Sequence, residues 1–208
     1  GYVAFVYEPD KINMEQLYQF LMNVSNSLET MKVHQRQQNI ISNLENKYIH
    51  DPLTGLLNRR GFYQKVLQQF KQCVTEQKHF IAISVDLNGL KKINDTYGHS
   101  DGDIAISAIG NILIKSSICD ETCARFGGDE FVMAGPLADN LDATDFLDKI
   151  HENINIFNET HDYPYNVSAS IGIITGVPTE DISLDDFIKA ADEEMYKDKV
   201  LHHQLRKD

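Results

Sequence analysis

A pair of glycines inside a strand-like stretch, "TCARFGGDEFVMAG" (122–135), constrains the fold of this chain more than any other feature. Gly127 and Gly128 supply the positive φ angles that a two-residue hairpin turn requires, so the stretch predicts two antiparallel strands joined at this pair. From residue 50 onward, the helical and strand patterns follow the order αβααββαβα, with this hairpin in the middle. The sequence therefore predicts an α+β fold in which helices flank a sheet.

Regular apolar patterns mark the other elements. Residues 80–86, "FIAISVD", form a nearly continuous apolar run that is typical of a strand buried on both faces, and this run ends at Asp86. A second strand is predicted at 167–175. Apolar residues at helical spacing predict helices at 62–73, from about residue 101, at 147–157 and at 187–199.

The segment from Asn13 to Tyr48 contains neither glycine nor proline, which predicts one long helix. Its apolar residues recur at heptad spacing: Met14, Leu17, Leu21, Val24, Leu28 and Met31. The polar stretch 34–39 interrupts this pattern, which resumes in a different phase. A two-stranded coiled coil is one interpretation, and an amphipathic helix lying on the body of the protein is the other.

Proline sets the predicted domain boundary. Asp51 precedes Pro52, and a residue before proline is disfavoured in the helical region, so the long helix should end here. We expect an N-terminal segment at 1–49 and a separate domain at 50–208. The apolar residues 2–7 predict a short strand, and the chain reads as a fragment with a sensor or membrane part upstream.

Charge and composition narrow the classes of partner. The net charge of −12 repels nucleic-acid phosphates, so we expect no nucleic-acid partner and only local phosphate binding through metal ions. Three cysteines provide no disulfide framework and suit a reducing, cytoplasmic location. No apolar run approaches the roughly 20 residues of a membrane span.

Three carboxylates form the candidate chemical centre. Asp86 ends a buried strand, and Asp129 and Glu130 follow the glycine turn. If the hairpin lies beside that strand, the three acids converge at one sheet edge, where their repulsion and lost hydration cost several kcal/mol. A divalent cation removes this cost, and two such ions can assist a phosphoryl displacement. The alternative is that Asp129 and Glu130 are ordinary hairpin residues in water.

The residues after Asp86 favour a phosphate site. Gly89 allows a close backbone approach, while the amides of Leu90 and Lys91 can face phosphates and Lys91 adds positive charge. Lys199 lies on the same helical stripe as Ile188, so it should point along the protein body. The alternative for Lys199 is an ordinary surface lysine.

These motifs together resemble one family. "RFGGDEF" resembles the signature of the GGDEF family, the bacterial diguanylate cyclases, and four further segments resemble the family in order and spacing. These segments are "DPLTGLLNRRGF", "DLNGLKKINDTYGHSDGD", "VSASIGIIT" and "ADEEMYKDK", and the resemblance covers residues 50–200. It implies a mostly antiparallel sheet like that of nucleotide cyclases and polymerase palms. The implied reaction condenses two GTP into cyclic di-GMP and releases two pyrophosphates at a two-fold interface.

The resemblance also implies residue roles. Asp86 and Asp129 would bind magnesium together with the Leu87 carbonyl, and Glu130 would hold a second ion, with manganese as a substitute metal. Asp129 and Glu130 would be the catalytic acids, Asp129 lying where the 3′-hydroxyl loses its proton. The implied substrate-binding residues are Gly89, Leu90, Lys91, Asn94, Asp103, Gly127, Gly128 and Lys199. Among them, Asn94 and Asp103 would recognise guanine, whose adjacent N–H donors suit a carboxylate.

Some positions depart from the family pattern. The family's product-binding R-x-x-D positions are Ile118 and Glu121 here, so we expect no product-inhibition site. His203 stands where an arginine would help to bind phosphate. The N-terminal part resembles the tail of a GAF-like sensor, and the helix predicts a homodimer. Two alternatives stay open: a catalytically silent module that binds GTP or cyclic di-GMP, and a cyclase of other nucleotides.

Overall fold

A computed structural model of the protein describes residues 14–119 and 121–205, without the side chains of 38–47, 203 and 205. The chain divides into two compact units, Gly1–Asn46 and Lys47–Asp208. The strand predicted at 2–7 lies outside the described residues, as does the side chain of His203. Within the described part, no helix is both long and apolar enough to cross a membrane.

The first unit contains most of helix α1, Met14–Ile49, which confirms the predicted long N-terminal helix. The apolar heptad positions Met14, Leu21, Leu28 and Met31 are all exposed. These side chains are not buried in a single chain. They would gain burial energy if another helix covered this face. The coiled coil itself stays a prediction.

The second unit holds the sheet and its helices. In chain order its elements are β1 (Leu57–Asn58), α2 (Arg59–Glu76), β2 (Phe80–Leu87), α3 (Leu90–Tyr97), α4 (His99–Ser116), β3 (Thr122–Gly127), β4 (Glu130–Pro136), α5 (Ala143–Thr160), β5 (Ala169–Gly176) and α6 (Leu184–Leu205). This order confirms the predicted one and adds β1, which is too short to leave a periodic signal.

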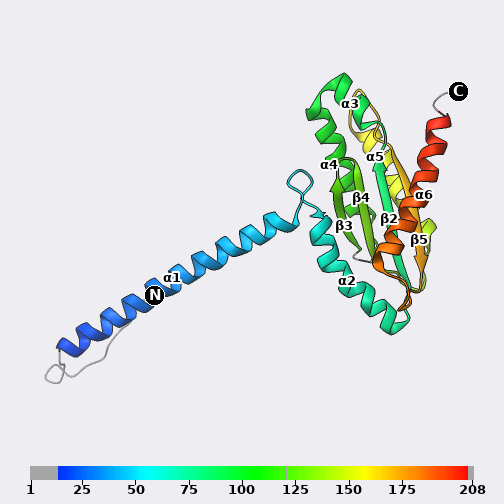
Figure 1. Ribbon diagram of the computed structural model, residues 1–208. Helices are drawn as coiled ribbons and strands as arrows, with labels where there is room; N and C mark the ends of the chain where they lie inside the picture. Colours follow the sequence, from blue (N-terminus) through cyan, green and yellow to red (C-terminus); the bar gives the residue numbers. More distant parts are fainter. Residues whose placement is uncertain (1–13, 120, 206–208) are drawn as a thin grey trace. The chain divides into compact units, whose positions relative to one another are not determined.

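The five strands form one sheet in the order β1-β3-β4-β2-β5. Only the β1–β3 pair is parallel, so the sheet is mostly antiparallel, as predicted. Helices cover both faces (Figure 1). Strand β2 lies between β4 and β5, and all eight of its residues are buried.

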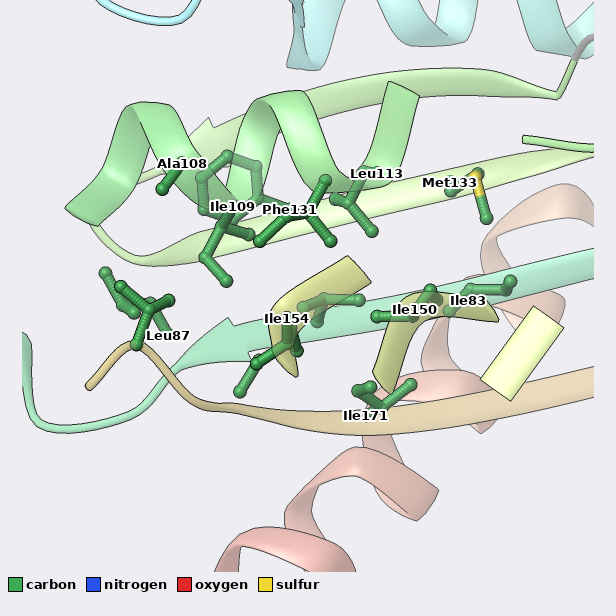
Figure 2. Packing of buried hydrophobic residues seen from close by; sticks show 14 of the residues in the cluster. Ile83, Leu87, Ala108, Ile109, Leu113, Phe131, Met133, Ile150, Ile154 and Ile171 are labelled. Carbon is green, nitrogen blue, oxygen red and sulfur yellow. The ribbon is translucent and has the colours of Figure 1, made fainter. Parts of the chain in front are cut away.

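Alternate residues of β2 contribute to two separate cores, because side chains along a strand point to opposite faces. Ile83 and Leu87 pack toward α4 and α5 with Phe131 and Met133 (Figure 2). Phe80 and Ala82 pack with α2 and α6 on the other face. Asp86 has the same parity as Phe80 and Ala82, so it belongs to the α2/α6 face.

The hairpin turn differs by one residue from the prediction. Gly127 pairs with Glu130, so the two central turn residues are Gly128 and Asp129 and not the two glycines. The physical reason is a bulge between Arg125 and Gly127, which inserts one extra residue into β3. Both glycines still have positive φ, 153° for Gly127 and 52° for Gly128. The shift places Asp129 in the turn and Glu130 at the first position of β4.

Candidate functional site

The site is built around the end of β2. Asp86 is only 4% exposed, and it lies opposite Glu130 on β4 and opposite Ser170 on β5. Residues directly opposite each other in an antiparallel ladder have their side chains on the same face. The sheet therefore presents two acids side by side, although they are 44 positions apart in the sequence.

Lys199 reaches Asp86 from α6. Its Nζ lies 2.8 Å from Oδ1 and 2.8 Å from Oδ2 of Asp86. A buried carboxylate needs such compensation, because a charge removed from water costs several kcal/mol unless it is paired. Of the two expectations for Lys199, the geometry agrees with the one that directs its side chain along the protein body.

Two of the three predicted acids, Asp86 and Glu130, are direct neighbours in the sheet, and Asp129 lies in the adjoining turn. Among the described residues no group of three or more histidine, cysteine, aspartate or glutamate side chains is arranged to hold a metal ion. The binding of metal by the three acids together stays a prediction. The shifted turn places Asp129 at the same end of the sheet as Asp86 and Glu130, and its carbonyl oxygen accepts a hydrogen bond from the Leu87 N–H at 3.0 Å.

Two carboxylates are nevertheless enough for magnesium. Magnesium sites in proteins usually use one or two carboxylates and complete the coordination with substrate phosphates and water. Asp86 and Glu130 are neighbours across the ladder, and the Leu87 carbonyl follows directly in the chain. This donor set consists of hard oxygen atoms and fits the ion, with the nucleotide supplying the remaining ligands.

Glycines near Asp86 and Glu130 leave the backbone accessible on both sides of these acids. Gly89 has a φ of 76° and precedes the first turn of α3, which contains Leu90 and an exposed Lys91. A Cβ atom at Gly127 or Gly128 would meet nothing within 4 Å. The backbone at these glycines is thus accessible, and the N-terminal amides of α3 carry the partial positive charge that favours phosphates.

The two residues predicted to recognise guanine lie on neighbouring helices. Asn94 belongs to α3 and Asp103 to α4, and a Cβ atom at Gly102 would lie 1.9 Å from the Asn94 Oδ1 atom. Asn94 is therefore packed directly against the residue that precedes Asp103. The Asp103 side chain is exposed, so it is accessible to a ligand.

Sequence reasoning missed an ion pair that holds the glycine turn. Arg125 donates to the Gly128 carbonyl oxygen through Nε at 3.0 Å and Nη2 at 2.7 Å, and its Nη1 lies 3.2 Å from both carboxylate oxygens of Asp51. Asp51 also accepts hydrogen bonds from the Thr54 N–H and hydroxyl group. Burial raises the pKa of Asp51, but the bonds from Thr54 and Arg125 outweigh it and leave that pKa below its usual value.

The positions of the family's product site have a different local role here. The Glu121 carboxylate is buried and accepts hydrogen bonds from the Ile118 N–H at 2.8 Å, from the Cys119 N–H and from the Ser117 hydroxyl group. Ile118 is apolar and packs against the core. Glu121 is thus engaged in holding its own loop.

Comparison with known proteins then identifies the family. A model described as the diguanylate cyclase GGDEF domain matches residues 48–204. This chain belongs to the GGDEF family. Among curated relatives, the diguanylate cyclase DgcP of Escherichia coli (strain K12) is 33% identical over 151 residues, with 72% of this chain and 44% of DgcP covered. The bifunctional diguanylate cyclase/cyclic di-GMP phosphodiesterase MucR of Pseudomonas aeruginosa is 30% identical over 151 residues, covering 73% of this chain but 22% of MucR.

Solved structures agree on the fold of the GGDEF domain. The GGDEF domain of YfiN from Pseudomonas aeruginosa is 26% identical, with a TM-score of 0.64 and coverage of 73% of this chain and 89% of that one. The coiled coil and GGDEF domain of DgcB from Caulobacter crescentus, solved with c-di-GMP, gives a TM-score of 0.68 at 20% identity. That match covers 88% of this chain and 94% of the DgcB chain.

Proposed function

We propose that this GGDEF domain is a diguanylate cyclase that condenses two GTP into cyclic di-GMP and releases two pyrophosphates with the help of magnesium. The observation that carries the proposal is the buried Asp86 facing Glu130 across the ladder, with the Lys199 ammonium group at 2.8 Å. This arrangement combines ligands for a cation with a positive group for phosphate, directly before the phosphate-facing turn of α3.

The phosphates and the base are bound by different parts of the site. The backbone at Gly89, Leu90 and Lys91 binds the outer phosphates, and the side chains of Lys91 and Lys199 neutralise their charge. Asn94 and Asp103 bind the guanine edge. An ionised aspartate accepts two hydrogen bonds from the guanine N1–H and 2-amino group, which adenine cannot offer together.

The chemistry requires the removal of a proton and the displacement of pyrophosphate. Asp129 takes the proton of the 3′-hydroxyl of one GTP, and that oxygen forms a bond to the α-phosphorus of the other GTP while the bond to pyrophosphate breaks. A second displacement, in which the 3′-oxygen of the other GTP loses its proton and bonds to the α-phosphorus of the first, releases the second pyrophosphate and closes the ring. Asp86, Asp129, Glu130 and the Leu87 carbonyl would hold magnesium, with two ions per GTP and manganese as a substitute. The bound ions would supply positive charge to the phosphates.

A product assay tests this function. The purified chain is incubated with magnesium and either GTP or ATP, and the cyclic product is identified by mass spectrometry. We expect cyclic di-GMP from GTP, no corresponding product from ATP, and no turnover after chelation of the metal. GTP binding by a dimeric chain that yields no product would instead support the silent regulatory module.

The reaction needs two copies of the domain, and we assign their pairing to the exposed heptad face of α1. Parallel pairing of two such helices would join two catalytic domains in a homodimer. Deleting residues 1–45 should leave GTP binding nearly intact but reduce turnover steeply, with the remaining rate rising as the square of the protein concentration. Full activity that is independent of concentration would contradict this assignment.

Feedback by product provides a separate test. Because Ile118 cannot make the bidentate contacts of an arginine and Glu121 is engaged with its own loop, added cyclic di-GMP should inhibit only by competition with GTP. Initial rates at several GTP concentrations distinguish the two modes. Non-competitive inhibition at low micromolar product would show that a product site exists.

A further inference from the structure

The relative position of α3 and α4 is decided at a single residue. Gly98, with a φ of 97° and a ψ of 166°, is all that separates the two helices. Asn94 and Asp103, which bind guanine under the proposed function, lie on opposite sides of this junction. Any change of angle at Gly98 therefore changes the separation of the two side chains.

Two tyrosines fix this junction from outside. The Tyr97 hydroxyl group, at the end of α3, donates to the Pro164 carbonyl oxygen at 3.0 Å. The Tyr165 hydroxyl group donates in the reverse direction, to the carbonyl oxygen of Asp101 in the first turn of α4, also at 3.0 Å. Their rings lie 5.4 Å apart, so the two residues form one unit that joins both helices to the segment before β5.

That segment is itself well anchored. The Asn158 side chain on α5 both accepts from the Val167 N–H and donates to the Val167 carbonyl, each at 2.8 Å. Tyr163 stacks on Tyr165 with a centroid distance of 5.7 Å. Burial and the nearby Asp101 raise the pKa of Tyr165 to about 12, so its hydroxyl group stays protonated and able to donate at neutral pH.

We propose that Tyr97 and Tyr165 are positioning residues for base recognition: they fix the angle between α3 and α4 and thereby hold Asn94 and Asp103 at the separation that selects guanine over adenine. The inference rests on the proposed function. Neither tyrosine needs to touch the nucleotide. Their hydroxyl groups act through the Gly98 junction, and the packing of Gly102 against Asn94 transmits the position of α4 to α3.

The test removes only the hydroxyl groups. Tyr97→Phe, Tyr165→Phe and the double variant retain the rings, and Tyr63→Phe is the matched control because it removes a tyrosine hydrogen bond to Asp185 in the α2/α6 layer. Binding of non-hydrolysable GTP and ATP analogues is measured by calorimetry, and the melting temperature is measured in parallel. We expect each site variant to lower the GTP-to-ATP preference roughly three- to tenfold, and the double variant to lower it further.

The control separates positioning from general stability. Tyr63→Phe should lower the melting temperature by a similar amount while leaving the base preference unchanged. Site variants that lose stability but keep the full preference for GTP would overturn the positioning role and leave the proposed function standing. A wild-type chain without any preference for GTP would overturn both, so the two failures are distinguishable.

Discussion

Two aspartates near the same end of the sheet are each paired with a cation, but the surroundings of the pairs differ. Asp51 accepts hydrogen bonds from the Thr54 backbone, the Thr54 hydroxyl group and the planar Arg125 guanidinium, donors that the fold holds in place. Asp86 faces the ammonium group of Lys199, at the end of a long flexible side chain that is 33% exposed. A carboxylate bound by fixed donors maintains structure, whereas one that faces a movable cation can exchange it for a ligand.

Asp86→Asn tests the exchangeable pair and should have the largest effect. The substitution removes the charge that binds metal but keeps the shape, so we expect cyclic di-GMP formation to fall at least a thousandfold, about 4 kcal/mol in the activation barrier. The folded state should survive, because Lys199 can extend into water. Steady-state rates and a thermal melt check both statements. A variant that kept more than about a tenth of the wild-type rate would refute the metal-binding role.

Lys199→Met tests the same pair from its other side. In the nucleotide-free chain it should lower the free energy of unfolding by about 1–2 kcal/mol, because the buried Asp86 loses its compensating charge. Lys197→Met is the matched control, since Lys197 pairs with Glu194 on the exposed surface of the same helix. Surface pairs contribute little, so the control should change the stability by less than about 0.5 kcal/mol. Equal effects of the two variants in urea denaturation would show that the Lys199–Asp86 pair stabilises the fold no more than an exposed surface pair does.

Asp51→Asn tests the fixed pair and should lower stability by about 1–2 kcal/mol at pH 7. The pKa of Asp51 is lowered in the folded chain, so folding is favoured by its ionised form. This contribution is fully present above the unfolded pKa of about 4 and is lost as the pH falls through the folded pKa. The difference between the variant and the wild type should therefore shrink below about pH 4. A difference that stays constant between pH 7 and pH 3 in chemical denaturation would exclude the charge as its cause.

Ser84→Ala should have the smallest effect, and it should be a gain. Ser84 lies two residues before Asp86 on the same face, and its buried Oγ atom has no hydrogen-bond partner among the described residues. Removing an unsatisfied buried hydroxyl group should raise the free energy of unfolding by about 0.5–1 kcal/mol. A loss of stability would mean that this oxygen has a partner, such as a buried water molecule.

The sequence predicted those features whose signal is local. The apolar run of β2, the helical spacing of Phe62, Val66 and Phe70, and the glycine turn each depend on neighbouring residues, and the structure agrees with them. The exact turn was off by one residue, because the bulge arises from pairing with β4 and not from the turn sequence.

Contacts between distant residues could not be predicted in this way. Lys199 and Asp86 are separated by 113 positions, and Arg125 and Asp51 by 74, so no periodicity links them. A charged residue such as Arg125 inside an apolar strand was the only available signal, and it does not indicate which residue pairs with it. The two tyrosines left no signal at all, since a tyrosine at a helix end is also a common surface residue.

The backbone and the side chain of the turn residue Asp129 have different roles, one in the fold and the other in the proposed chemistry. Its contribution to the fold comes from its carbonyl oxygen, which accepts the Leu87 N–H, and any amino acid that tolerates the turn supplies that atom equally well. The fold therefore does not depend on the Asp129 side chain. In a library of all substitutions at this position, cellular abundance should vary little while product yield varies widely, so variants with altered chemistry can arise here without first losing the protein.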